Sequence, residues 1–354
     1  MKGVLFDDGT IEISDAVELR APGPDEVRVR LTAAGVCHSD LSVVNGTIPY
    51  PTPVVLGHEG AGVVEEVGAA VTTVKPGDTV VLSTLGSCGR CIKCEQGRPT
   101  LCPQSFGRFE KPFTVAGRPA FQFANTSVFV EHTVVRETSA IPVDPKVPAS
   151  SAALIGCAVL TGAGAVFNRA QVERGQTVAV FGVGGIGLNV IQAAHIAAAG
   201  RIIAVDNQPA KEAMAREFGA TDFVDSSQTD AVTALKDLVP GGLDVTFEAV
   251  GHTGLLRTAI DVLAPGGTCV VLGVPPFGQE ASFMVAGLYQ DKAILGCRYG
   301  SSRPRADITM LADLYLAGRL KLDELVSRTY PLDDVEQVFS DMHGGGLARG
   351  VILF

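Results

Sequence analysis

The chain has 354 residues, with 28 lysines and arginines against 38 aspartates and glutamates, so its formal net charge is −10. At about 100–200 residues per domain this length predicts two domains. Hydrophobic residues make up 46% and charged residues 19%, which indicates a compact globular protein and excludes a disordered chain. The acidic balance argues against nucleic acid as a partner. Since no run of about 18 apolar residues is evident, we expect a soluble, cytoplasmic protein without a membrane partner.

The first 150 residues or so have the pattern of β-structure. Gly3–Phe6 and Ile11–Ser14 flank a turn at 7–10, as in a β-hairpin. Apolar and basic residues alternate over Val27–Leu31, and a Pro-Gly turn precedes the apolar run Thr79–Leu82. With no long amphipathic helix in this part, the pattern predicts a closed or partly closed antiparallel barrel.

The pattern changes after about Cys157 to alternating strands and helices. A short apolar run, Thr177–Phe181, is typical of a strand buried on both faces. Further strands are predicted at Arg201–Val205, Asp222–Val224, Leu243–Phe247 and Thr268–Leu272, and helices over Ile186–Ala198, from Pro209 to Gly219, Asp230–Val239 and Gly254–Leu263. This alternation predicts a parallel sheet covered by helices.

A glycine-rich loop follows the first of these strands directly and opens a helix, with the sequence Gly182-Val183-Gly184-Gly185-Ile186-Gly187. In that context the pattern G-x-G-x-x-G is typical of a loop whose bare backbone lets a pyrophosphate approach the helix N-terminus. Asp206 ends the second strand, where its carboxylate can accept hydrogen bonds from an adenosine ribose and would repel a 2′-phosphate. The pair predicts binding of NAD in preference to NADP. The alternative is a structural turn followed by a surface aspartate.

Four of the eight cysteines lie within fifteen residues, with two, two and seven residues between them: Cys88, Cys91, Cys94 and Cys102. This spacing favours a structural zinc ion, because four thiolates close a tetrahedral site and leave no open position. An iron–sulfur cluster is the first alternative, but its usual run has three residues before the last cysteine. A redox dithiol leaves two thiols without a role.

Three other candidate metal ligands are scattered along the chain: Cys37, His58 and Cys157. Two thiolates and one imidazole would leave a fourth position open, as in a catalytic zinc site. Each residue alone is equally consistent with an ordinary buried side chain. Spacing therefore does not decide between the two interpretations.

Together these motifs resemble the zinc-dependent alcohol dehydrogenases of the medium-chain dehydrogenase/reductase family. The resemblance runs from about residue 3 to Phe354 and includes Gly57-His58-Glu59 with the glycines after it, both cysteine sets, the glycine loop and Arg349-Gly350-Val351. It implies an α/β protein with a β-barrel. A GroES-like catalytic domain over 1–158 and 297–354 would enclose a Rossmann, doubly wound parallel-sheet, NAD-binding domain over 159–296. It also implies two zinc ions per chain.

The resemblance assigns roles around the catalytic zinc. Cys37, His58 and Cys157 would ligate the metal, Glu59 would exchange with a ligand, and Asp40 would orient the histidine. The metal would polarise the oxygen of an alcohol or aldehyde substrate while hydride passes to or from NAD.

Further roles follow for the proton and the cofactor. Ser39 would pass the alcohol proton outward, although Ser42 stands where many relatives have a histidine that ends this relay. Cofactor contacts are implied for Asp206 and Lys211 at the adenosine ribose, Thr161 near the nicotinamide and Arg349 at the pyrophosphate.

The small side chains of Ser39 and Thr84 suggest space for bulky or aromatic alcohols. We therefore expect reversible oxidation of primary alcohols to aldehydes by a homodimer, with a homotetramer as the other possibility. Two alternatives stay open: a formaldehyde dehydrogenase that acts on a thiol adduct, and an enzyme with tightly bound NAD(H) and an external electron acceptor. Cys269 and Cys297 are expected to be core residues.

Overall fold

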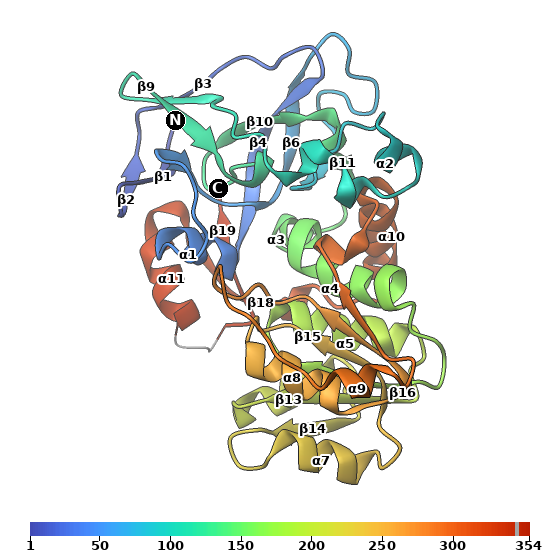
Figure 1. Ribbon diagram of the computed structural model, residues 1–354. Helices are drawn as coiled ribbons and strands as arrows, with labels where there is room; N and C mark the ends of the chain where they lie inside the picture. The colour runs from blue at the N-terminus through green and yellow to red at the C-terminus, as the bar shows by residue number, and fades with distance from the viewer. Residues whose placement is uncertain (344–346) are drawn as a thin grey trace. The chain divides into compact units, whose positions relative to one another are not determined.

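The computed structural model of the protein describes residues 1–343 and 347–354. The chain forms two compact units (Figure 1). Unit 1 contains residues 1–160 and 303–354, and unit 2 contains residues 161–302. The domain boundaries given above stay a prediction.

Unit 1 is built on two sheets. The first has the order β2-β1-β5-β9-β8-β3 and consists of β1 (Gly3–Asp7), β2 (Thr10–Ser14), β3 (Val17–Leu19), β5 (Val54–Val55), β8 (Phe113–Val115) and β9 (Arg118–Gln122). The second has the order β11-β7-β6-β4-β19-β18, and β10 also pairs with β4. Its strands are β4 (Glu26–Val36), β6 (Glu59–Val67), β7 (Thr79–Leu82), β10 (His132–Arg136), β11 (Ala140–Pro142), β18 (Val326–Pro331) and β19 (Arg349–Leu353).

The predicted hairpin between β1 and β2 is confirmed, and its turn residues Asp8 and Gly9 both have positive φ, at 45° and 83°. The turn before β7 is also confirmed, with Gly77 at φ 93°. The prediction of antiparallel pairing for the first 150 residues was wrong at one place, because β5 pairs with β9 in parallel. These two strands are distant in sequence, so no hairpin pattern predicts their pairing. Near the C-terminus, outside the part covered by that prediction, β18 and β19 also pair in parallel.

The helices of unit 1 are short, apart from two near the C-terminus. They are α1 (His38–Val44), α2 (Ile92–Glu95), α3 (Ala149–Leu154), α10 (Pro304–Leu316) and α11 (Val335–His343). After α3 the helix continues as a π-helical segment, Ile155–Val159, and then as α4 (Leu160–Gly164). The stretch Ala149–Ala170 is long and apolar enough to cross a membrane by composition, but 89% of its apolar 18-residue window is buried inside the protein, as in the core helix of a globular domain.

Unit 2 contains one six-stranded sheet. Its parallel pairing was predicted, as were all of its strands except the last in the chain, Ala293–Gly296. Its order is β14-β13-β12-β15-β16-β17, and its strands are β12 (Thr177–Phe181), β13 (Arg201–Asp206), β14 (Asp222–Asp225), β15 (Leu243–Glu248), β16 (Leu263–Val271) and β17 (Ala293–Gly296). In chain order this is 3-2-1-4-5-6, the arrangement of a dinucleotide-binding Rossmann fold. The helices are α5 (Gly185–Ile196), α6 (Glu212–Glu217), α7 (Ala231–Leu238), α8 (Thr253–Asp261) and α9 (Val285–Leu288), and the first four pack on the strands.

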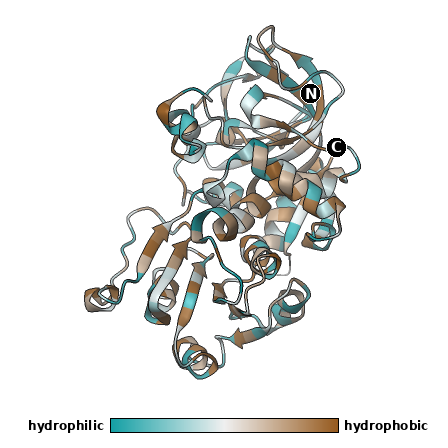
Figure 2. Ribbon diagram, turned by 90° about the vertical axis from the view of Figure 1, so that its right-hand side faces the viewer, coloured by the Kyte–Doolittle hydropathy of each residue, from teal (hydrophilic) through white to brown (hydrophobic). Residues whose placement is uncertain are grey.

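The core of unit 2 is apolar, and its central strands β12, β13 and β15 are buried along most of their length. Figure 2 shows brown, hydrophobic residues along these strands. Cys269 in β16 is fully buried, as expected, whereas Cys297 just after β17 is only half-buried. The half-buried position follows from β17 lying at the edge of the sheet.

The glycine loop has the backbone that its sequence requires. Gly182 has φ 95°, which favours glycine. A Cβ atom on Gly187 would lie 1.8 Å from the carbonyl oxygen of Gly182, so only glycine lets α5 begin this close to β12.

We expect Gly187→Ala to lower the free energy of unfolding by about 1–3 kcal/mol, the usual cost of overpacking. Gly184→Ala is the matched control, because a Cβ atom there meets nothing within 4 Å. It should change stability by about 0.5 kcal/mol or less. Urea denaturation measures both, and equal losses would contradict the packing argument.

Candidate metal centre and dinucleotide-binding loop

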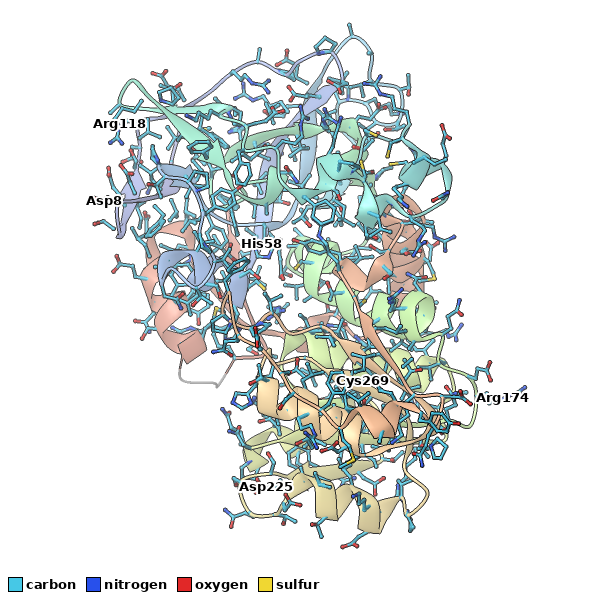
Figure 3. All side chains as sticks on the ribbon, viewed as in Figure 1. Asp8, His58, Arg118, Arg174, Asp225 and Cys269 are labelled. Atoms are coloured by element: carbon cyan, nitrogen blue, oxygen red, sulfur yellow. The ribbon has the colours of Figure 1, made fainter. Side chains whose placement is uncertain are left out.

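The strand register of unit 1 gathers the candidate ligands where the C-terminal end of β4 lies beside the N-terminal end of β6, and we call these strand ends one edge of the second sheet. β4 and β6 are antiparallel with Gly35 opposite Glu59, so Cys37 just after β4 lies near His58 just before β6. β19 pairs with β4 on its other side with Gly350 opposite Val36, which brings Arg349 to the same edge. Figure 3 labels His58 at this edge.

Two glycines allow this close approach. Gly57 has φ 88°, and a Cβ atom there would lie 2.6 Å from the backbone nitrogen of Phe129. A Cβ atom on Gly35 would lie 2.4 Å from Oε2 of Glu59, so the glutamate side chain occupies the space above Gly35. Packing around the site thus explains why glycine stands at Gly57, before His58, and at Gly35, opposite Glu59.

Cys157 reaches the same edge from the π-helical segment after α3, which packs against β6 and β7. A Cβ atom on Gly156 would lie 2.1 Å from the carbonyl oxygen of Leu82 at the end of β7. The glycine beside the cysteine therefore sets how closely this segment approaches the sheet. Wide π-helical turns are frequent at functional sites.

The ligand atoms of Cys37, His58, Glu59 and Cys157 all lie within 4.8 Å of one another, and all four residues are buried. Both carboxylate oxygens of Glu59 are buried without a hydrogen-bond partner. Nε of Arg349 lies 3.8 Å from Oε2 of this carboxylate. Because a buried carboxylate without a hydrogen-bond partner is costly, this donor set fits a bound cation. Two thiolates and one imidazole fit zinc and leave room for a further ligand.

Asp40 supports this group from the third residue of α1. Its Oδ1 accepts a hydrogen bond from Nδ1 of His58 at 2.9 Å, and its Oδ2 accepts one from the backbone N–H of Cys37 at 3.0 Å. With Nδ1 engaged, only Nε2 of His58 is left to bind a metal. Asp40 is fully buried, so both of its bonds are shielded from water.

Burial and charge shift the pKa values of these residues. Burial raises the pKa of Glu59 to about 7, although Arg349 opposes the shift. For His58, burial favours the neutral ring, but the Asp40 carboxylate outweighs it and holds the pKa well above its ordinary value. The hydrogen bond from Cys157 lowers the pKa of Cys37, and the pKa of Cys157 is raised in turn.

The second cysteine set lies in the loop around α2. Sγ of Cys88 lies 3.7 Å from Sγ of Cys102, and Sγ of Cys91 lies 3.6 Å from Sγ of Cys94. Four sulfurs at about 2.3 Å from a tetrahedral zinc ion would be about 3.8 Å apart, so this set fits zinc. The backbone N–H of Arg90 lowers the pKa of Cys88 to about 6, which favours its thiolate.

In unit 2, Asp206 lies beside the glycine loop. Its Oδ2 accepts a hydrogen bond from the N–H of Val183 at 2.8 Å, and its Oδ1 accepts one from the N–H of Gln208 at 3.0 Å. Lys211 Nζ lies 3.1 Å from the same carboxylate. The two residues predicted to contact the adenosine ribose, Asp206 and Lys211, are therefore close together and lie beside the glycine loop.

The other predicted residues are placed as follows. Ser39 Oγ lies 3.9 Å from Sγ of Cys37, and Ser42 is on the same short helix, where its carbonyl accepts a hydrogen bond from Ile48. Thr161 is buried in unit 2. Arg349 is 5% exposed beside Glu59, which excludes a solvated surface charge; its role toward pyrophosphate stays a prediction.

An aromatic series beside the zinc site was not predicted from the sequence. The ring of Phe123 lies edge-on to His58 at 5.4 Å, and the rings of Tyr50 and Phe109 continue outward from Phe123. These residues are distant in sequence and share no periodicity, so only the folded arrangement brings them together.

Two sequence families match the chain. The family described as "Alcohol dehydrogenase GroES-like domain" matches residues 23–145, and the one described as "Zinc-binding dehydrogenase" matches residues 185–316. An alcohol dehydrogenase class-3 from Myxine glutinosa is 39% identical over 350 residues, covering 96% of this chain and 93% of the relative. An S-(hydroxymethyl)glutathione dehydrogenase from Photobacterium damsela subsp. piscicida is 38% identical, covering 95% and 94%.

Solved structures with a similar fold include further zinc-binding or alcohol dehydrogenases. A benzyl alcohol dehydrogenase from Acinetobacter calcoaceticus matches with a TM-score of 0.94 at 34% identity, covering 100% of this chain and 99% of that one. An alcohol dehydrogenase zinc-binding domain protein from Burkholderia ambifaria gives 0.95 at 37% identity, covering 100% and 98%. The chain belongs to the zinc-dependent alcohol dehydrogenases of the medium-chain dehydrogenase/reductase family. It is an NAD-dependent oxidoreductase. Its two sets of candidate metal ligands, one of four cysteines and one that includes His58, fit two zinc ions.

Single substitutions should separate the two metal sites. We expect both Cys37→Ser and Cys91→Ser to lower the zinc content from two ions to one per chain, because each removes one ligand. Only Cys37→Ser should abolish turnover, whereas Cys91→Ser should mainly lower the melting temperature. Metal analysis by mass spectrometry, alcohol oxidation and thermal unfolding measure these effects.

Cys269→Ser is the control, since this buried cysteine lies outside both sets and its replacement should leave two zinc ions bound. A Cys37→Ser protein that keeps two zinc ions and full turnover would contradict the assignment of the catalytic site.

Proposed function

We propose that this enzyme oxidises aromatic primary alcohols to aldehydes with NAD, and catalyses the reverse reduction. The observation that carries the proposal is the aromatic series beside His58. Phe123 meets the imidazole at an interplanar angle of 88°, and Tyr50 meets Phe123 at 82° with ring centroids 5.1 Å apart. Edge-to-face rings at such distances contribute about 0.5–1.5 kcal/mol per pair, which a substrate ring can also gain.

The outer end of the series is open to solvent. Tyr50 is held by a hydrogen bond from its hydroxyl to the carbonyl oxygen of Gln122 at 2.7 Å. Phe109 lies 5.4 Å from Tyr50, is 48% exposed and has φ 50°, a rare conformation for a large residue. We infer that a flat apolar substrate enters beside Phe109 and makes ring contacts with Tyr50 and Phe123 on its way to His58. The structural similarity to a benzyl alcohol dehydrogenase supports the same substrate class.

We further infer the roles of the metal-site residues. Cys37, His58 and Cys157 hold a zinc ion, with Glu59 as an additional carboxylate ligand, and Cys88, Cys91, Cys94 and Cys102 hold the second zinc ion. When bound, the first ion supplies a Lewis acid that lowers the pKa of an alcohol.

Other residues of the protein then orient the metal ligands and transfer the alcohol proton. Asp40 fixes the His58 ring and the start of α1 through its two buried hydrogen bonds. In this proposal Ser39 Oγ, which is half-buried and 3.9 Å from the Cys37 sulfur, accepts the alcohol proton and hands it toward solvent. Ser42 cannot store that proton near neutral pH, so the relay ends in water.

For the cofactor we propose that the N–H groups of the glycine loop, over Gly182, Gly184, Gly185, Ile186 and Gly187, bind the pyrophosphate at the N-terminus of α5. Asp206 and Lys211 contact the adenosine ribose, which disfavours a 2′-phosphate. Thr161 lies near the nicotinamide, and Arg349 contacts the pyrophosphate.

A thiol-adduct formaldehyde dehydrogenase is the second candidate, since several relatives at 37–38% identity are S-(hydroxymethyl)glutathione dehydrogenases. An enzyme with tightly bound NAD(H) is the third. Purified protein with nicotinamide absorbance before cofactor is added would favour the third candidate.

A substrate panel followed by NADH absorbance decides among these functions. We expect kcat/KM for benzyl alcohol to exceed that for ethanol about tenfold or more, as one or two ring contacts would give. Phe123→Leu should reduce the preference, whereas Phe113→Leu in β8 should lower stability and leave the preference unchanged. Faster turnover of formaldehyde with glutathione than of any aromatic alcohol would contradict the proposal.

We also infer a homodimer formed through unit 2. β17 ends the sheet, and among the described residues large apolar side chains nearby are exposed: Phe277 (96%), Met284 (65%), Val285 (73%) and Tyr289 (93%). An edge strand beside an exposed apolar patch is a typical association surface. The alternative is a homotetramer.

Sedimentation velocity should give about twice the chain mass of 36.7 kDa. Val285→Glu should shift the protein toward monomer, because it places a charge in the apolar surface. Arg174→Glu, in a surface turn of unit 2 away from this segment in sequence, is the charge-change control. A monomeric native protein would contradict the inference.

We infer a cytoplasmic location for this enzyme, which cell fractionation tests.

A further inference from the structure

The loop after β15 lies at the point where the connections of the parallel sheet reverse direction. β12 and β15 are adjacent in the sheet, with Phe181 opposite Glu248, and the chain leaves them toward opposite edges. Ligands of such sheets bind in the crevice at this switch point. The loop at 249–252 therefore borders the cofactor region.

Glu248, the last residue of β15, organises this loop from beneath. Its Oε1 accepts hydrogen bonds from the backbone N–H groups of Val250 at 3.0 Å, Gly251 at 2.8 Å and His252 at 3.3 Å. The residue is only 1% exposed. Three successive N–H groups aimed at one point form a nest that would otherwise bind an anion. The carboxylate of Glu248 fills that nest.

The loop held in this way contacts the glycine loop. A Cβ atom on Gly182 would lie 2.5 Å from Cγ2 of Val250, so the valine lies directly against the first glycine of the motif. On the other side, a Cβ atom on Gly251 would lie 2.8 Å from the backbone of Val274. Val250 is 52% exposed and Val274 is 74% exposed, so both present apolar surface to this region.

We propose that Glu248 is a positioning residue for NAD. It holds Val250 against the glycine loop, and it occupies a second cluster of N–H groups that would compete for the cofactor's phosphates. The pyrophosphate is thereby directed to the N-terminus of α5. The proposal concerns the cofactor alone and is independent of which alcohol the enzyme oxidises.

The test is the dissociation constant of NADH, measured on the zinc-loaded enzyme by the rise in NADH fluorescence without any alcohol present. Glu248→Ala should raise this constant about tenfold, which corresponds to about 1.4 kcal/mol. Glu248→Gln keeps an oxygen acceptor and should recover much of the affinity. Val250→Ala, at an exposed position, should also weaken NADH binding without disturbing the buried carboxylate.

Asp244→Asn is the matched control. Asp244 lies near the opposite end of β15, and its carboxylate accepts hydrogen bonds from the N–H and hydroxyl of Thr177 at the start of β12, at 2.7 and 2.8 Å. Its replacement should lower the melting temperature and leave NADH affinity unchanged.

If Glu248→Ala does not fold, Val250→Ala decides the question. Weaker NADH binding by Glu248→Ala or, failing that, by Val250→Ala supports the proposal when Asp244→Asn keeps the native affinity and Glu248→Gln stays near it. Affinities of Glu248→Ala and Val250→Ala within about twofold of the native enzyme overturn the proposal, because that difference is only about 0.4 kcal/mol.

Discussion

Asp40 accepts one hydrogen bond from the ring of His58 and another from the backbone of Cys37, in a part of unit 1 that water does not reach. The arrangement of the site depends on this carboxylate. It fixes Cys37, which follows β4, and His58, which precedes β6, and its buried charge stabilises a positive group beside it. Glu59 adds a second buried carboxylate whose oxygens have no hydrogen-bond partner, so the region as a whole favours a cation. Sheet register, glycine positions and the π-helical segment all serve to gather donors around that charge.

Much of this could be predicted from the sequence. The glycine loop follows a buried strand and opens a helix, a local pattern typical of dinucleotide binding. Five of the six strands of the parallel sheet around it were predicted, and the edge strand β17 was not. The four-cysteine loop is also local, since its thiols lie within fifteen residues. By contrast, Cys37, His58 and Cys157 are brought together by register and helix packing between distant segments. Their spacing alone did not decide between ligands and ordinary core residues, and the family resemblance was needed.

Other features could not be predicted because their signals are not periodic. The parallel pair β5–β9 joins strands from distant parts of the chain, and a short strand such as Val54–Val55 carries no alternation. The edge-on and tilted ring contacts among Phe123, Tyr50 and Phe109 depend on three separate segments. Glu248 looks like any acidic residue at a strand end until its three backbone partners are known. In each case the information lies in the tertiary contacts, which local propensity does not encode.

The position of Arg349 has a consequence for how the protein is made. Its side chain is buried against Glu59, yet it comes from β19, near the C-terminus, while Glu59 and most other residues of the site are encoded in the first part of the chain. During synthesis the acidic residues and thiols leave the ribosome long before the strand that brings their balancing guanidinium. Unit 1 therefore completes its second sheet, and gains this buried guanidinium, only after all of unit 2 has been translated.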